Sequence, residues 1–203
     1  MTKLILFCLT AAALAGCASG SKGPAPTSYD FGPMSALAAS GTAAPAAAQF
    51  PALVVADVTG PASLDTNRMF YRLMYADAGQ PRPYAYNNWS VTPLQLLSQR
   101  MKARFAQGGL KVLNTTDAAG GLPLLRLEAD EFSQNFDSEK SSSASVSLRA
   151  SVFRNHQLID QRTFSRKASA DSADAAGGAR ALAGASDAIA ADILAWLATL
   201  PKQ

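Results

Sequence analysis

The chain has 203 residues, of which 48% are hydrophobic and 16% are charged, and its formal net charge is +3. This length suffices for one domain with a substantial core, and a second full domain is not expected. Lysines and arginines are scattered without a dense basic block, which argues against a nucleic-acid partner. Of the two cysteines, Cys8 lies in an N-terminal segment that we expect to be removed. The remaining chain therefore has no disulfide, and its stability must come from packing.

The N-terminus has the layout of a secretory signal. Lys3 precedes the mostly apolar residues 4–14, and small residues follow. The apolar run is shorter than the roughly 20 residues that a membrane-spanning helix needs. Leu14-Ala15-Gly16-Cys17 resembles the bacterial lipobox, whose cysteine is lipidated and becomes the new N-terminus. We therefore expect a lipoprotein signal over residues 1–16 and acyl chains on Cys17, and an ordinary secreted protein is the alternative.

Residues 17–28 are predicted to be the lipidated cysteine and a flexible tether. Residues 18–28 are small, polar and proline-containing, and they extend over at most about 36 Å. Residues 29–203 then form a single domain. An aspartate after the lipidated cysteine commonly signals retention in the inner membrane, whereas Ala18 and Ser19 are uncharged. This favours an outer-membrane location.

The first half of the domain shows the patterns of short strands. Strands or extended segments are predicted at 29–32, 52–58, 68–75 and 84–89. The Ala-rich residues 35–49 indicate a loop, and Gly79-Gln80-Pro81-Arg82-Pro83 indicates a turn.

A helix follows this half. Thr92 and Pro93 are residue types favoured at the N-cap and the first helical position, and Gly108-Gly109 ends the helix. Its apolar stripe consists of Leu94, Leu97, Met101 and Phe105.

The second half of the domain shows further strand patterns. A short strand is expected at 110–113 and another strand at 124–132, and a turn at Gly120-Gly121 separates them. From Ser143 to Phe153 apolar residues alternate with mainly serines, which is typical of a half-buried antiparallel strand with one wet face. Residues 154–157 form a turn, and residues 158–168 return as the hairpin partner.

The last element is an Ala-rich helix over about 174–200, which Pro201 ends. Gly177, Gly178 and Gly184 weaken its start. Its apolar stripe consists of Leu182, Ile189, Ile193, Trp196 and Leu200. The order of elements predicts an α+β, two-layer domain with one mostly antiparallel sheet and two helices packed on one face.

Residues suited to catalysis are sparse. His156 is the only histidine, and it lies in a predicted turn. Without cysteine partners it cannot complete a usual zinc site, and no nucleophile motif, P-loop or dinucleotide fingerprint accompanies it. We therefore expect no enzyme, no metal and no cofactor other than the covalent lipid on Cys17.

Glu128 and Asp130 share one face of a predicted strand, roughly 7 Å apart. This spacing suits calcium binding or acid–base chemistry. A solvated strand face is the favoured interpretation, because no other part of the sequence supplies acidic partners.

Five aromatic residues cluster in the first half, namely Tyr71, Tyr75, Tyr84, Tyr86 and Trp89. An interface and core packing explain them about equally well. Tyr84, Tyr86 and Trp89 are the candidate contacts for a partner, because the two tyrosines lie beside prolines in a predicted loop. The serines Ser143, Ser145 and Ser147 would pair with another chain if their strand lay at an edge, although a solvent-facing role is more common.

Several stretches together resemble a known family. They are Tyr29-Asp30-Phe31-Gly32-Pro33, Leu64-Asp65, Met69-Phe70-Tyr71-Arg72-Leu73, Tyr86-Asn87-Asn88-Trp89 with Pro93, Phe132-Ser133-Gln134-Asn135-Phe136 and Trp196-Leu197. With the lipobox, their order and spacing resemble the ABC-type transport auxiliary lipoproteins, which include the lipoprotein of the paraquat-inducible system.

The resemblance implies a non-catalytic periplasmic lipoprotein that forms rings. It implies work with a mammalian-cell-entry (MCE) domain protein and inner-membrane ABC transport components, to move lipids or apolar solutes between the two membranes. The alternative is an outer-membrane lipoprotein that regulates peptidoglycan synthesis or envelope assembly, and an envelope hydrolase is the weakest hypothesis.

Overall fold

The computed structural model describes residues 24–34, 50, 52–117 and 120–201. The predicted signal, Cys17 and the Ala-rich loop at 35–49 lie outside the described residues. The described strands are β1 (Thr27–Tyr29), β2 (Ala52–Val55), β3 (Arg68–Leu73), β4 (Asp77–Trp89), β5 (Lys111–Leu113), β6 (Leu124–Ser138), β7 (Ser141–Arg154) and β8 (Gln157–Ser169). The described helices are the 3-10 turn η1 (Ala62–Leu64), α3 (Pro93–Gln107) and α4 (Ala175–Leu197).

Strand β6 organises an eight-stranded sheet. On one side it forms a long antiparallel ladder with β7, which pairs in the same way with β8. Its other side is shared by two parallel strands, β2 at Leu124–Leu125 and β3 at Gln134–Phe136. Strands β5 and β4 continue the sheet beyond these two, and β1 pairs with the end of β4. The sheet is therefore continuous through β6 and divided beyond it.

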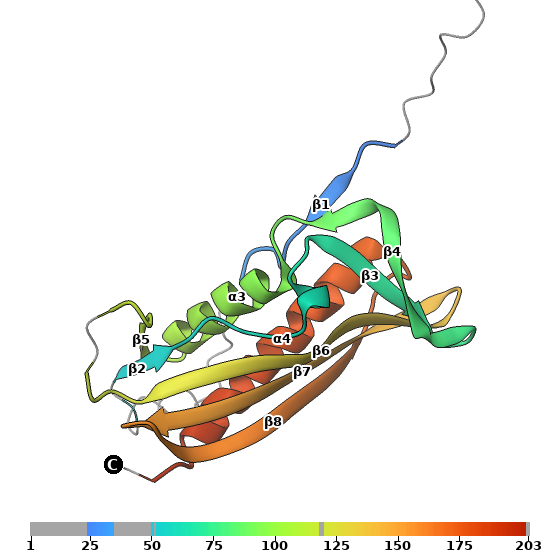
Figure 1. The fold of residues 1–203 in the computed structure, drawn as a ribbon. Coiled ribbons are helices and arrows are strands. Elements are labelled where there is room, and N and C mark those ends of the chain that lie inside the picture. Colours follow the sequence, from blue (N-terminus) through green and yellow to red (C-terminus); the bar gives the residue numbers. More distant parts are fainter. Residues whose placement is uncertain (1–23, 35–49, 51, 118–119, 202–203) are drawn as a thin grey trace, which may run out of the picture.

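Helices α3 and α4 lie on the same side of this sheet (Figure 1). Helix α4 packs on β6, β7 and β8, and α3 packs against α4. All five residues of the predicted α4 stripe are buried. In the predicted α3 stripe, Leu97, Met101 and Phe105 are buried, and Leu94 is partly buried against the same core. The predicted α+β fold is confirmed. No helix in the described part of the chain is long and apolar enough to cross a membrane.

The predicted start of α3 is confirmed in detail. The Thr92 hydroxyl accepts a hydrogen bond from the Gln95 N–H, and the Gln95 side chain accepts one from the Thr92 N–H. This reciprocal pair forms a capping box and satisfies two backbone donors that a helix start leaves free. Pro93 is the first helical residue, where its missing N–H costs nothing.

Helix α4 begins at Ala175 despite its early glycines. The Asp174 carboxylate caps it by accepting the Gly177 N–H at 2.7 Å. A Cβ atom on Gly177 would lie 2.1 Å from the Ser172 carbonyl oxygen, and one on Gly178 would lie 2.1 Å from Gln134 Oε1. Gly177 therefore lets the chain before α4 turn closely against the helix, and Gly178 lets this end of α4 approach β6, which compensates for their low helix propensity.

The predicted β7–β8 hairpin is confirmed. Its two-residue turn holds Asn155 and His156 at φ values of 48° and 66°. Positive φ at both positions is the geometry that matches the right-handed twist of paired strands, and Asn tolerates it well.

The predicted turn at 79–83 is wrong, because these residues lie inside β4. The β3–β4 turn occurs earlier, where the Ala76 N–H bonds the Leu73 carbonyl. Pro81 and Pro83 are tolerated because this part of β4 pairs only with β3 among the described strands, and β1 reaches only residues 87–89. An edge position does not require the N–H groups that proline lacks.

Strand bounds also differ near the N-terminus. The first strand covers Thr27–Tyr29 rather than 29–32, because the Asp30 carboxylate accepts the Gly32 N–H at 2.7 Å and turns the chain. The second strand ends at Val55 rather than 58, since the chain bends so that the Val58 N–H bonds the Ser98 hydroxyl of α3.

The expected wet face of the Ser143–Phe153 strand is confirmed only in part. Ser145, Arg149 and Phe153 are partly exposed, whereas Ser143, Ser147 and Ser151 on the same face are buried. Hydrogen bonds join Ser147 to Ser165, and Gln161 to Ser151. Because β7 lies between β6 and β8, it has no free edge and cannot pair with another chain.

Candidate functional site

The division of the sheet beyond β6 creates an apolar cavity, which we call the β3–β6 pocket. Strand β3 pairs with β6 only over three residues, and β2 joins β6 at its far end. The cavity lies beside β3 and β6, is lined also from η1, β4, α3 and α4, and measures about 240 Å³. Most of its lining is apolar, and it comprises Ser63, Leu64, Arg68, Phe70, Tyr71, Arg72, Pro81, Trp89, Pro93, Phe132, Ser133 and Leu182.

Four separate stretches of the family resemblance meet at this pocket. Leu64 comes from the first, Tyr71 and Arg72 from the second, and Trp89 with Pro93 from the third. Phe132 and Ser133 add the stretch at 132–136. In the sequence these residues are spread over 70 positions, and tertiary pairing of β3, β4 and β6 brings them together.

The pocket wall is continuous with the aromatic core. Trp89 and Phe132 pack with ring centroids 5.7 Å apart, and Phe31 contacts both rings. Trp89 is only 3% exposed. Its role is therefore packing, in agreement with the core alternative for this aromatic residue.

Two arginines of β3 border the pocket. The Arg68 guanidinium lies 5.7 Å from the centre of the Phe70 ring, and Arg72 Nη1 donates to the Ala78 carbonyl at 2.9 Å. Within the described residues neither arginine forms an ion pair with a carboxylate. The apolar cavity thus carries two positive charges at its border that the described part of the chain leaves uncompensated.

Tyr84 belongs to a buried polar network beside the pocket. Its hydroxyl donates to Gln134 Oε1 at 2.9 Å, and its ring lies 4.6 Å from that of Tyr71. Burial raises the pKa of the Tyr84 phenol far above its ordinary value, so the hydroxyl remains a donor. Gln134 in turn donates to Ser142 and to the Asp174 carbonyl, each at 2.9 Å. This network connects β4 to the start of α4.

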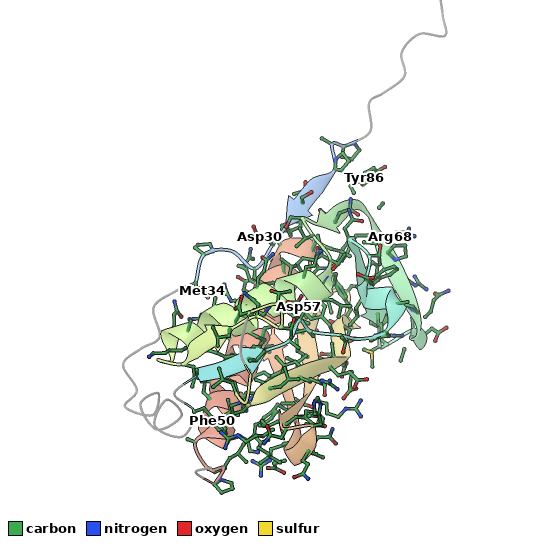
Figure 2. The ribbon with its side chains drawn as sticks, turned by 60° about the vertical axis from the view of Figure 1, so that its left-hand side comes forward. Asp30, Met34, Phe50, Asp57, Arg68 and Tyr86 are labelled. Carbon is green, nitrogen blue, oxygen red and sulfur yellow. The ribbon has the colours of Figure 1, made fainter. Side chains whose placement is uncertain are left out.

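The structure separates the three predicted contact residues. Tyr84 is half-buried, Trp89 is in the core, and Tyr86 is 48% exposed. All three lie on strand β4 rather than on a loop. Figure 2 shows Arg68 and Tyr86 toward the β1 end of the molecule, with Phe50 near the opposite end. Sequence reasoning missed Gln134, because a polar residue within an aromatic stretch gives no sign that it is buried.

The acidic pair on β6 has a cationic neighbour. Arg149 Nη2 lies 3.2 Å from Glu128 and 3.0 Å from Asp130. These exposed ion pairs agree with the favoured interpretation of a solvated strand face. Among the described residues no group of three His, Cys, Asp or Glu side chains is arranged to hold a metal ion.

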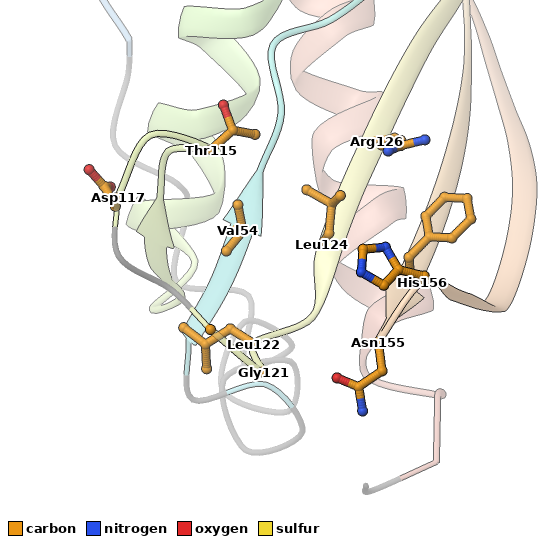
Figure 3. A pocket seen from close by; sticks show the side chains of 11 residues that line it. Val54, Thr115, Asp117, Gly121, Leu122, Leu124, Arg126, Asn155 and His156 are labelled. Atoms are coloured by element: carbon orange, nitrogen blue, oxygen red, sulfur yellow. The ribbon is translucent and has the colours of Figure 1, made fainter.

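A second hollow lies at the other end of the sheet (Figure 3). It measures about 530 Å³ and is bordered by Asp117, Arg126 and His156. Each of these comes from a different segment, and His156 is an exposed residue of the β7–β8 turn. The hollow is an open surface depression with a lining of mixed polar and apolar residues.

Two buried arginines tie the helices together, which the sequence pattern did not reveal. Arg100 and Arg104 of α3 both donate to the Asp187 carboxylate of α4, and Arg100 also bonds the carbonyls of Phe31 and Gly32. Burial alone raises the pKa of Asp187, but the hydrogen bonds from both arginines outweigh it and hold that pKa below its ordinary value. This cluster fixes the N-terminal segment beside α3.

Comparison with solved structures supports the same architecture. A crystal structure from Xanthomonas campestris superposes with a TM-score of 0.62 at 19% identity, covering 72% of this chain and 83% of that one. The crystal structure of another protein, called uncharacterized, gives 0.61 at 15% identity, covering 84% and 97%. These likenesses establish a shared fold. Comparison with curated proteins gives no match.

A family model described as the ABC-type transport auxiliary lipoprotein component matches residues 33–194. The match spans β2 to α4, and so includes every segment that lines the β3–β6 pocket. It confirms the resemblance inferred from the separate sequence stretches. The chain therefore belongs to the ABC-type transport auxiliary lipoprotein component family.

Proposed function

We propose that this protein is a non-catalytic, lipid-anchored component of an envelope transport system. It faces the periplasm from the outer membrane and works with an MCE-domain protein and inner-membrane ABC components to move lipids or apolar solutes. The observation that carries the proposal is the family match over residues 33–194.

The anchoring part of the proposal rests on the sequence before the domain. Cys17 ends a lipobox-like tetrad, and Thr27, where β1 starts, follows it by only ten residues. Even fully extended, this connection spans at most about 35 Å, so the β1 end of the domain would stay close to the membrane. The uncharged Ala18 and Ser19 favour the outer membrane over the inner one.

The absence of catalysis is proposed from how the charged groups are used. The partly buried carboxylate of Asp187 is occupied by two arginines, and Glu128 and Asp130 share Arg149. Tyr84 and Gln134 connect structural elements through their hydrogen bonds. The hydrogen bonds and ion pairs of these groups account for their presence as structural contacts, so no catalytic role is needed to explain them.

For partner contact, Tyr86 is the strongest of the three predicted residues. It is exposed on β4, whereas Tyr84 and Trp89 already have packing roles. An exposed tyrosine supplies a large apolar ring with a polar tip, which is the type of residue that often anchors an interface. The self-association into a ring that the family resemblance implies remains part of the proposal.

The test is affinity purification of the tagged full-length lipoprotein from membranes. We expect an MCE-domain protein to co-purify, and Tyr86→Ala to weaken its capture by at least about tenfold, as for an interface anchor. Tyr75→Ala is the matched control, because Tyr75 is also about half exposed on the same hairpin. A peptidoglycan synthase in place of transport components would favour the alternative function.

Membrane fractionation tests the anchor separately. The protein should follow the outer membrane, and Cys17→Ser should leave an unprocessed, unlipidated precursor. Recovery of the native protein wholly with the inner membrane would overturn the proposed location.

A further inference from the structure

We propose that the β3–β6 pocket binds one acyl chain of an anionic phospholipid, with the lipid phosphate held at the rim by Arg68 and Arg72. The inference rests on the transport and anchoring role proposed above, and it adds the class of molecule that the domain would bind.

The size and lining of the pocket suit a single chain. Its volume of about 240 Å³ is smaller than the roughly 300–1,000 Å³ of sites that enclose a drug-sized ligand. A whole two-chain lipid does not fit. The lining offers Leu64, Phe70, Phe132 and Leu182, and burying a methylene group against such side chains contributes about 0.8 kcal/mol.

The rim supplies the charge that a lipid phosphate requires. Arg68 and Arg72 both line the pocket together with Phe70 of the same strand. Guanidinium groups bind phosphate oxygens through paired, charge-assisted hydrogen bonds. Because neither arginine pairs with a described carboxylate, an anion at this rim would not have to displace one.

The position of the pocket favours a lipid over a soluble anion. Strand β1 pairs with the end of β4, with Tyr29 opposite Trp89, and Trp89 lines the pocket. The chain leading to the proposed anchor at Cys17 therefore leaves the domain beside this cavity. Figure 1 shows β1 extending from the same end of the molecule as β3 and β4. A tether of ten residues keeps this end within reach of lipid headgroups.

The experiment uses the full-length lipoprotein in cells whose lipids carry radioactive phosphate. A photo-crosslinking residue, p-benzoylphenylalanine, replaces Ser63, which is exposed on η1 and lines the pocket mouth. The same residue at Ser90 is the control, because Ser90 is an exposed serine beside β1 that is absent from the pocket lining. After irradiation we expect labelled lipid on the Ser63 variant at a level at least about tenfold above the Ser90 variant.

Charge variants in the Ser63 background test the rim. Arg68→Gln should reduce lipid labelling by on the order of tenfold, because a charge-assisted contact is lost. Arg82→Gln removes the same charge from the neighbouring strand, but Arg82 is opposite Tyr71 in the ladder and does not line the pocket. It should leave labelling unchanged. The acyl chains expected on Cys17 carry no phosphate, so the label reports a separate lipid.

Three outcomes would overturn the inference. Equal labelling at Ser63 and Ser90 would mean general proximity to the bilayer, and protein adducts without lipid at Ser63 would mean that a partner side chain fills the pocket. Capture of the MCE-domain protein is measured in the same extracts. Absence of labelled lipid on the Ser63 variant with Arg68 and Arg72 intact, together with normal capture, overturns the pocket inference alone, whereas lost capture with normal labelling overturns the transport role alone.

Discussion

The two edges of β6 adjoin very different regions of this molecule. On the side of β7, β8 and α4, long antiparallel ladders and an Ala-rich helix bury a continuous apolar core. On the side of β1, β3 and β4, pairings are short, prolines interrupt the ladder, and arginines and tyrosines lie at the surface. The first region contains most of the buried apolar core, and the second contains a cavity bordered by Arg68 and Arg72, which form no ion pair among the described residues.

The irregular strand pairing is concentrated around β3 and β4, where the apolar pocket and its bordering arginines lie. A complete ladder between β3 and β6 would close the pocket, and replacing Pro81 or Pro83 by a regular strand residue would add edge hydrogen-bonding groups. We expect the regular region to be the more sensitive to the loss of a buried contact. The following predictions measure this difference, beginning with the largest effect.

Trp196→Ala should destabilise the regular region most. Its indole packs on Phe164, with ring centroids 5.6 Å apart, and its Nε1 donates to Asp160 at 2.9 Å. Truncating a buried tryptophan costs about 3–5 kcal/mol, which is a large fraction of a domain's stability. Thermal unfolding should show a markedly lower Tm. An unchanged Tm would mean that the indole contributes nothing to the core.

Asp187→Ala should cost about 3 kcal/mol, the lower end for breaking a buried pair, because Asp187 is 22% exposed. The change leaves Arg100 and Arg104 without their shared carboxylate. Asp192→Ala is the control, since its partner Arg166 is exposed and its loss should matter much less. Denaturant unfolding of both variants checks the difference, and equal losses would contradict a special role for the buried cluster.

The same carboxylate predicts a dependence on pH. Since its folded pKa is lowered, the stability that Asp187 contributes is present above the unfolded value of about 3.9 and is lost as pH falls toward the folded value. The free energy of unfolding of the wild type should therefore drop more steeply below about pH 4 than that of Asp187→Asn. Parallel curves would show that another group controls acid unfolding.

A matched pair of glycines separates local propensity from packing. Gly178→Ala places a Cβ 2.1 Å from Gln134 Oε1, and we expect a loss of about 1–3 kcal/mol from this overlap. Gly184→Ala meets nothing within 4 Å, so it should stabilise α4 by up to about 1 kcal/mol. Denaturant midpoints give both signs. Stabilisation by both changes would mean that α4 does not approach β6 so closely.

The smallest effects on stability are expected at the irregular end. Arg68→Gln and Tyr86→Ala alter exposed residues, and each should change the free energy of unfolding by no more than about 0.5 kcal/mol. Their effects should appear in ligand or partner binding instead. A large loss of stability in either variant would erase the proposed contrast between the two regions.

The sequence was most informative where neighbours along the chain decide the structure. Thr92, Pro93 and Gln95 encode the start of α3 through local hydrogen bonds, and Asn155-His156 encodes the β7–β8 turn through backbone preference. The alternation along β7 and the stripe of α4 predicted the core face correctly. These patterns succeed because their physical causes act within a few residues.

Other features depended on distant segments. Pro81 and Pro83 suggest a turn until β4 is known to lie at an edge. The serines of β7 suggest a uniformly wet face until their cross-strand hydrogen bonds, such as that of Ser147 with Ser165, are known. By its propensity Gly178 weakens a helix, and only its position against Gln134 shows that a larger residue would not fit there. In each case a residue's role depends on a contact partner that its own neighbourhood in the chain does not reveal.

The sequence by itself therefore determined the family, the fold class and the principal core stripes of this protein. Tertiary structure alone decided the β3–β6 pocket, because its lining comes from η1, β3, β4, α3, β6 and α4. It also decided that Arg100 and Arg104 converge on Asp187, which lies 87 and 83 residues further along the chain. Local patterns specify which face of an element is apolar, but only the packing of all elements determines where they leave a gap.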